Sequence, residues 1–142
     1  MTIKMLVAFD GSELSKQALA EVRNQAVNAE DKEVHIVQVA NPAGPSTFAA
    51  VSREISKEMA ETLEGDMEEV KKELVQEDYR VITKVIVGKD NPGVAICEYA
   101  KEQDMDLIII GNRKLGNVKR LFLGSVSNNV VQNAPCPVLV MK

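Results

Sequence analysis

The amino-acid sequence predicts an α/β fold, a doubly wound parallel sheet of five strands with helices on both faces, in three layers. Five short β-rich runs alternate with helical segments along the chain, and most of the runs are nearly continuous Val, Ile and Leu. Such runs are typical of parallel strands buried on both faces and joined by right-handed crossovers. The 142 residues, 45% of them hydrophobic, suffice for one core. We therefore expect a single domain over residues 1–142.

The first half of the chain is expected to supply two strands and two helices. A turn at Asp10-Gly11-Ser12 separates the first strand from a segment rich in good helix formers. The loop Pro42–Ser46 precedes a long segment with apolar residues at three- or four-residue steps, which predicts an amphipathic helix and makes the loop a candidate lid. The expected elements are a strand at Ile3–Phe9, a helix at Glu13–Ala29, a strand at Val34–Val39 and a helix from about Phe48 to Glu77.

The second half continues the alternation with three strands and two helices. Gly88 follows the third strand, and Pro92 suits the first turn of the helix after it. The expected elements are strands at Arg80–Val87, Asp106–Ile110 and Val138–Met141 and helices at Val94–Glu102 and Ser125–Asn133.

Polar and glycine residues follow the first and fourth strands. A doubly wound sheet binds its ligand beyond the carboxyl ends of the strands, where the strand order reverses, and these two strands are the natural flanks. Asp10 would then face Gly111, with the helix start at Gly124 and Ser125 nearby. Singly, helix capping explains Asp10 and Ser12, and turn geometry explains the glycines. Together, glycines, small hydroxyls and a helix N-terminus predict a phosphate site.

Charge and hydropathy exclude two classes of partner. The net charge is -4 and the pI is near 5.1, whereas a nucleic-acid binder that neutralises phosphates needs a basic surface. The longest apolar runs are strand-sized, and the chain passes from Met1 directly into the first strand. We therefore expect no nucleic-acid partner, no membrane span and a cytoplasmic location.

The cysteines and the single histidine show no catalytic or metal-binding pattern. Cys97 and Cys136 have no CxxC spacing and no histidine nearby in the sequence, so both are interpreted as small core residues. His35 is expected at the start of the second strand, where a lone histidine is more often solvated or hydrogen-bonded than a catalytic base. The sequence contains neither a P-loop nor the loops of a kinase, so no catalytic residue is predicted.

The segment Gly111–Ser125 is similar to a loop of form G-x2-G-x9-G-[ST], with Lys114 at the second glycine. Asp10 ends the first strand, Val39 ends the second, and Ala134–Val140 forms the last. In these features the chain resembles the universal stress protein family from end to end. The resemblance implies a Rossmann-like fold, of the adenine nucleotide alpha hydrolase-like type, and an ATP-binding role in the stress response.

The resemblance also implies which residues bind the ligand, ATP or another adenine nucleotide. Val39 would line the adenine, Asp10 would face the ribose, and the glycines with Ser125 and Ser127 would hold the phosphates. Mg²⁺ could be held through the phosphates, near Asp10. The expected nucleotide-binding residues are Ala8, Asp10, Val39, Ile110, Gly111, Arg113, Lys114, Gly124, Ser125, Val126 and Ser127.

Lys114 departs from the family pattern, and two outcomes follow. If the position needs a positive φ or a close backbone approach, lysine costs about 1 kcal/mol and could block a phosphate. Alternatively, Lys114 and Arg113 could offset the lost glycine by charge-assisted hydrogen bonds to the phosphates, and Gly116 could relieve the backbone. Retained nucleotide binding is favoured, with weaker affinity allowed.

Three functions remain open at this point. The first is an ATP-binding regulatory protein of the stress response, whose nucleotide state alters its shape or partners. The second is a nucleotide-free interaction module with the same fold, its pocket closed by Lys114. The third is a slow ATP hydrolase, which is allowed but not expected, because no nucleophile and base pair stands out. Lys119 and Arg120 are interpreted as solvated charges and left outside the site.

The last strand, Val138–Met141, is apolar and would be an aggregation hazard at a bare sheet edge. Pairing with the same strand of a second copy would cover it. The resemblance likewise implies a homodimer formed through this strand.

Overall fold

Five strands and three complete helices are defined in the computed structural model, which describes residues 2–9, 13–26, 30–40, 68–87, 91–112 and 124–142. The strands are β1 (Thr2–Ala8), β2 (Asp31–Ala40), β3 (Arg80–Val87), β4 (Leu107–Gly111) and β5 (Val138–Met141). The helices are α1 (Glu13–Gln25), α3 (Pro92–Glu102) and α4 (Ser125–Asn133), together with a helical segment at 68–76.

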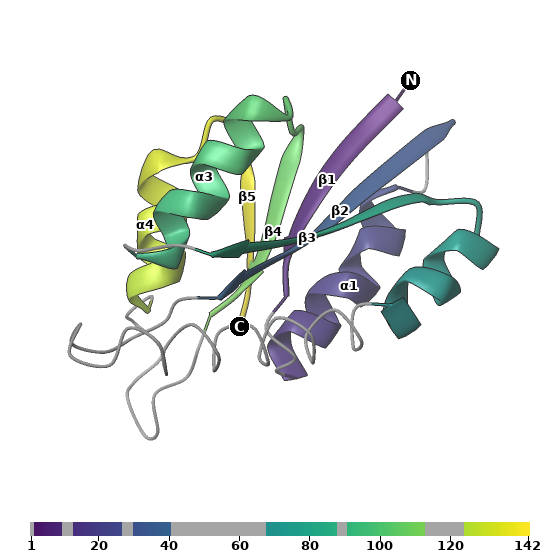
Figure 1. The fold of residues 1–142 in the computed structure, drawn as a ribbon, viewed down its shortest axis with the longest axis horizontal. Helices are drawn as coiled ribbons and strands as arrows, with labels where there is room; N and C mark the ends of the chain where they lie inside the picture. The colour runs from purple at the N-terminus through teal and green to yellow at the C-terminus, as the bar shows by residue number, and fades with distance from the viewer. Residues whose placement is uncertain (1, 10–12, 27–29, 41–67, 88–90, 113–123) are drawn as a thin grey trace.

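The strands form one parallel sheet in the order β3-β2-β1-β4-β5 (Figure 1). β1 lies at the centre and pairs with β2 from Thr2↔Asp31 to Ala8↔Val37. On its other side it pairs with β4 from Met5↔Leu107 to Val7↔Ile109. The chain therefore builds outward from β1 to β3 before it crosses to β4. The predicted α/β class and the predicted reversal of strand order between the first and fourth strands are both confirmed.

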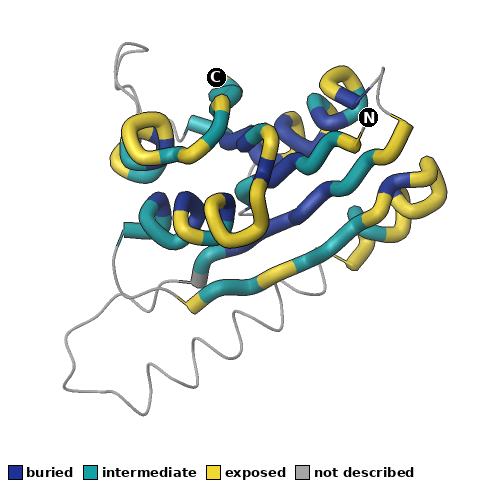
Figure 2. Tube along the Cα trace, turned by 90° about the horizontal axis from the view of Figure 1, so that it is seen from above, coloured by how far each residue is buried: buried dark blue, intermediate teal, exposed yellow. Residues whose placement is uncertain are grey.

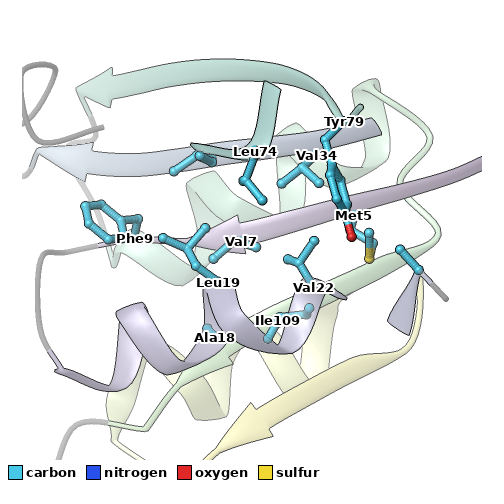
Figure 3. Packing of buried hydrophobic residues seen from close by; sticks show 12 residues of the cluster. Met5, Val7, Phe9, Ala18, Leu19, Val22, Val34, Leu74, Tyr79 and Ile109 are labelled. Atoms are coloured by element: carbon cyan, nitrogen blue, oxygen red, sulfur yellow. The ribbon is translucent and has the colours of Figure 1, made fainter. Parts of the chain in front are cut away.

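The alternation of side chains along the strands supplies one apolar core to each face of the sheet. Met5 and Val7 of β1 pack with side chains of α1 and the 68–76 segment (Figure 3). Leu6, between them, belongs to a second core with Ile96 of α3 and Val130 of α4. Figure 1 shows the two helix layers on opposite sides of the sheet, and Figure 2 shows buried central strands beneath exposed outer helix faces. Within the described ranges, no helix is long and apolar enough to cross a membrane.

Element bounds differ from the expectation mainly where backbone pairing extends past the apolar residues. β2 begins at Asp31 rather than Val34, because its first residues pair with the start of β1 although their charged side chains give no apolar signal. β4 begins one residue later than expected, because Asp106 instead forms two hydrogen bonds with the backbone of Lys4. Its Oδ2 accepts from the Lys4 N–H at 2.9 Å, and its N–H donates to the Lys4 carbonyl at 2.8 Å.

The other bounds follow the expectation closely. β1 ends at Ala8 rather than Phe9, and α3 begins at Pro92 rather than Val94, whereas β3, α4 and β5 have the expected bounds. α1 ends at Gln25 and Ala26 is in a turn, so the expected helix is too long there, whereas its residues 27–29 lie outside the described residues. The candidate lid Pro42–Ser46 and the expected helix up to residue 67 also lie outside them.

Candidate functional site

A pocket of about 270 Å³ opens at the carboxyl ends of β1, β2 and β4, beside the first turns of α3 and α4. Its apolar wall comes from the strands and α3 and consists of Ala8, Phe9, Val37, Val39, Pro92, Ile96 and Ile110. Its rim comes from α1, the end of β4 and the start of α4 and consists of Ser15, Gly111, Gly124, Ser125, Val126 and Ser127. A ligand here would meet an apolar wall on one side and backbone amides with small hydroxyls on the other.

Most of the residues that the sequence assigns to a site meet in this pocket. Those that line it are Ala8, Val39, Ile110, Gly111, Gly124, Ser125, Val126 and Ser127. Asp10, Arg113 and Lys114 lie outside the described residues. Five further residues line the pocket that were not expected there, namely Phe9, Ser15, Val37, Pro92 and Ile96. Val37 could have been predicted from the sequence, because a residue two positions before Val39 points to the same face of a strand.

The N-terminus of α4 begins at a glycine, which has no side chain to cap it. Gly124 is its N-cap residue, in an extended conformation with φ -61° and ψ 163°, and within the described part of the chain it makes no side-chain cap hydrogen bond. The first helical hydrogen bond runs from the Asn128 N–H to the Gly124 carbonyl at 2.9 Å. Helix geometry leaves the N–H groups before it without intrahelical acceptors, and the helix dipole favours negative charge at this end. The first turn contains no acidic side chain to occupy this position.

The start of α3, which also borders the pocket, is different. Asn91 is its N-cap residue, and its Oδ1 accepts from the Gly93 N–H at 2.8 Å. The chain therefore satisfies this helix start internally. Compared with the start of α3, the helix start at Gly124 is the more suitable for an external anion.

Asn112 fixes the start of α4 relative to the end of β4. Its Oδ1 accepts a hydrogen bond from the Gly124 N–H at 2.8 Å. Its own N–H donates to the Met141 carbonyl of β5 at 2.8 Å. The rim of the pocket is thus tied to the sheet at both ends of the segment 113–123.

Ser127 is buried, and its hydroxyl donates to the Gly111 carbonyl at 3.2 Å. A hydroxyl has one proton to donate, so in this arrangement the Ser127 proton is used inside the protein. The bond joins the first turn of α4 to the last residue of β4. Ser125, in contrast, is exposed at the rim.

Two glycines, Gly111 in the pocket lining and Gly93 next to the lining residue Pro92, are explained by close packing. A Cβ at Gly111 would lie 2.7 Å from the Leu14 Cβ of α1, so only glycine lets α1 approach the end of β4 this closely. A Cβ at Gly93 would lie 2.8 Å from the Val126 carbonyl oxygen, so Gly93 lets the starts of α3 and α4 approach each other. Both glycines set the shape of the pocket through the elements that they bring together.

His35 and the cysteines lie outside the pocket lining. His35 is in the body of β2 rather than at its start, and it is buried and hydrogen-bonded, so the solvated alternative is wrong. Cys97 is buried as expected, and burial raises the pKa of its thiol. Cys136 is half-buried against the same core, and burial raises its pKa as well. Neither thiol has the lowered pKa of a reactive cysteine.

Metal-ligating side chains do not gather in the described part of the chain. No group of three or more His, Cys, Asp or Glu side chains there could hold a metal ion. Asp10 is not among the described residues.

Comparison with known proteins identifies relatives over the full length. The model of the Universal stress protein family matches residues 1–142. Universal stress protein YxiE of Bacillus subtilis is 31% identical over 152 aligned positions, which cover 98% of this chain and 98% of the relative. The solved structure of hypothetical protein MJ0577, from Methanocaldococcus jannaschii, has a TM-score of 0.84 and 30% identity and covers 98% of this chain and 94% of its own.

Two further solved structures share the fold at lower identity. The universal stress protein from Archaeoglobus fulgidus in complex with dAMP has a TM-score of 0.61 and 23% identity, covering 99% of this chain and 98% of its own. A universal stress protein in complex with cAMP has a TM-score of 0.59 and 22% identity, covering 99% of this chain and 96% of its own.

Proposed function

The chain belongs to the universal stress protein family, and from that premise we propose that it is a regulatory protein that binds ATP in the pocket beside β1 and β4. The observation that carries the proposal is the start of α4 at Gly124, to which the described residues supply no acidic side chain and no N-cap side chain, directly beside an apolar wall. A planar base suits that wall, and phosphates suit the first-turn N–H groups of the helix start, which have no intrahelical acceptors. Two structures of this fold are complexes with dAMP and with cAMP, which likewise combine an adenine base with a phosphate.

Each part of the pocket has a role in this proposal. The adenine lies against Val39 and Ile96, which face the pocket from β2 and α3. The phosphates accept hydrogen bonds from the first-turn N–H groups and from the Ser125 hydroxyl at the rim. Ser127 acts indirectly, because its hydroxyl proton is used by Gly111. Asp10 faces the ribose, and Arg113 and Lys114 complete the phosphate site.

Mg²⁺ enters this proposal only with the nucleotide. The described residues offer no cluster of carboxylates that would hold the ion alone. Phosphate oxygens are ligands that Mg²⁺ prefers, and the ion keeps several waters. Asp10, which follows β1 in the sequence, is the residue that we propose to lie near it.

The direct test is to ask which nucleotide the purified protein carries and binds. Mass spectrometry would identify nucleotide released on denaturation, and calorimetric titration with Mg-ATP and with AMP would measure affinity. We expect saturable heat with one nucleotide per chain. The absence of both bound nucleotide and titration heat up to millimolar concentration would instead favour the nucleotide-free interaction module.

Two variants separate the remaining alternatives. Lys114→Gly restores the motif glycine, so tighter ATP binding would mean that the lysine obstructs and weaker binding that it contributes. Phosphate release above a no-protein control, lost in Asp10→Ala, would support slow hydrolysis. We propose binding without physiological turnover, and therefore expect no such release.

The open edge of β5 is the proposed homodimer surface. The strand order ends at β5, and its four residues are all only partly buried in the monomer. A second copy would satisfy the outward-facing backbone groups and cover the apolar side chains. We also propose that the protein is cytoplasmic and that residues 1–142 form a single domain.

A further inference from the structure

A hydrogen-bonded chain of three side chains lies behind the apolar wall of the pocket. His35 is only 2% exposed, with its Nδ1 2.7 Å from the Tyr99 hydroxyl and its Nε2 3.2 Å from Glu33 Oε2. This geometry suits the neutral imidazole, because the Tyr99 hydroxyl then donates to Nδ1 and the Nε2–H donates to the Glu33 carboxylate. Both ring nitrogens are satisfied in that state. We call Glu33, His35 and Tyr99 the brace.

The brace connects the two elements that form the wall. His35 precedes Val37 by two residues on β2, so both side chains point to the same face of the sheet. Tyr99 follows Ile96 by three residues on α3, and therefore lies about one helical turn away. Val37 and Ile96 both line the pocket. The hydrogen bond between His35 and Tyr99 thus holds β2 against α3 immediately behind the proposed adenine site.

Charged groups from both neighbouring strands surround the brace. Lys4 of β1 places its Nζ 3.7 Å from Glu33 Oε2, and Arg80 of β3 places its Nε 3.5 Å from Glu33 Oε1. From α3, Tyr99 supplies the polar group that contacts the imidazole. Burial lowers the pKa of His35 below its ordinary value of 6.5, Glu33 opposes this, and Lys4 and Arg80 add to it. The imidazole is therefore neutral at pH 7 and takes up a proton only in acid.

We propose that the brace makes nucleotide binding sensitive to acid, so that protonation of His35 lowers the affinity of the pocket for ATP. Protonation places a charge at a buried position and forces the bond to Tyr99 to reverse, with Nδ1–H now donating to the hydroxyl oxygen. The charged form favours an interface between β2 and α3 that admits water. Such an opening separates Val37 from Ile96, the two wall residues next to the brace.

This inference rests on the proposed nucleotide site, and linkage makes it quantitative. A ligand that holds the two walls together disfavours the protonated, opened form. ATP must therefore lower the pKa of His35, and acid must weaken ATP binding by the corresponding factor. The two effects are measured independently and must agree.

The single histidine in the chain makes the titration unambiguous. The imidazole Hε1 signal is followed by NMR from pH 8 to pH 5, without nucleotide and with saturating Mg-ATP. Calorimetry measures ATP affinity at pH 7.5 and pH 5.5 in the wild type and in His35→Gln. The variant is the control, because protonation of the ATP phosphates affects binding to both proteins equally. We expect wild-type affinity to fall about fivefold more than that of the variant. Equal falls, or the same His35 pKa with and without ATP, would overturn the proposal.

Tyr99→Phe tests the hydrogen bond between His35 and Tyr99 directly. It also provides a second test of the proposal if His35→Gln folds poorly. This variant retains a titrating His35 but loses the bond to α3, so the shift of the His35 pKa on ATP binding should largely disappear. An undiminished shift would show that the brace does not carry the coupling. If no nucleotide binds at any pH, the proposed function fails. The coupling is then decided by whether the Ile96 methyl signals follow the His35 titration in the wild type and not in Tyr99→Phe.

Discussion

The side-chain oxygen of Asn112 accepts a hydrogen bond from the backbone N–H of Gly124 at 2.8 Å. This single bond joins the residue after β4 to the residue before α4. Asn112 is itself fixed by the bond from its N–H to the Met141 carbonyl. The helix start that we propose as the phosphate site is therefore positioned by the sheet.

Replacement of Asn112 should weaken both the fold and the site. Asn112→Ala removes the acceptor for the Gly124 N–H, and we expect a loss of about 1 kcal/mol in the free energy of unfolding. ATP affinity should fall as well, because the start of α4 is no longer held. Asn112→Asp is the matched control, since it keeps the acceptor but adds a negative charge beside the phosphates. It should retain stability in urea unfolding and still lose ATP affinity. Unchanged affinity in both variants would contradict this role.

Gly111 should tolerate no side chain while Leu14 is present. The Cβ of Gly111→Ala would lie 2.7 Å from the Leu14 Cβ, which forces β4 and α1 apart. We expect the free energy of unfolding to fall by about 1–3 kcal/mol. Leu14→Gly removes the opposing atom, so a double-mutant cycle should show that the two changes together cost less than their sum. Simple additivity would mean that this contact does not set the spacing.

Acid should destabilise the fold in two steps. Above pH 6.5, His35 is neutral in both the folded and the unfolded chain. Below it the unfolded chain binds the proton first, because burial lowers the pKa of the folded residue, and the free energy of unfolding declines. The second step belongs to Glu33. Burial alone would raise its pKa, but the hydrogen bond with His35 and the charges of His35, Lys4 and Arg80 lower it overall.

The contribution of Glu33 is therefore lost only as the pH falls below about 4.5, through its folded value. Urea unfolding at a series of pH values measures both steps. His35→Gln should remove the step that lies between pH 6.5 and the lower pKa of folded His35. An equal decline of wild type and variant across that window would assign it to other groups.

The proposed dimer depends on backbone groups at the open edge of β5. The Pro137 and Met141 carbonyls accept hydrogen bonds from the β4 side, so the backbone of Val140, in alternation, faces outward. Val140→Pro removes the outward N–H and leaves the bonds to β4 intact. Light scattering at micromolar concentration should give a dimer mass for the wild type and a folded monomer for the variant. Leu139→Pro is the control and should unfold, because its N–H faces β4. A monomeric wild type would refute the dimer.

Much of the fold was predictable because apolar runs and helix signals set its elements independently of one another. Arg80–Val87 and Val138–Met141 were predicted with their observed bounds. The meeting of Val39, Gly111 and Ser125 at one pocket was also predictable, because parallel strands end at the same edge of the sheet.

The rest of the site depends on distances that no pattern encodes. Ile96 lines the pocket because α3 packs closely against the start of α4, which Gly93 allows. Nothing in the sequence marks Gly93 as a helix contact or Gly111 as a contact with Leu14. His35 was placed at the start of a strand because the charged residues before it gave no apolar signal. Its partnership with Tyr99 joins residues 64 positions apart.

The central claim, that the start of α4 holds the phosphates of ATP, is tested most directly by a charge at Ser125. Ser125 is exposed at the rim of the pocket, in the first turn of α4. Ser125→Asp should raise the stability of the fold by about 0.3–1 kcal/mol, because a negative charge complements the helix dipole. Calorimetric titration with Mg-ATP should show affinity at least about tenfold weaker than for the wild type and for the neutral control Ser125→Asn, because like charges then meet. Equal ATP affinity for Ser125→Asp and Ser125→Asn would contradict the claim.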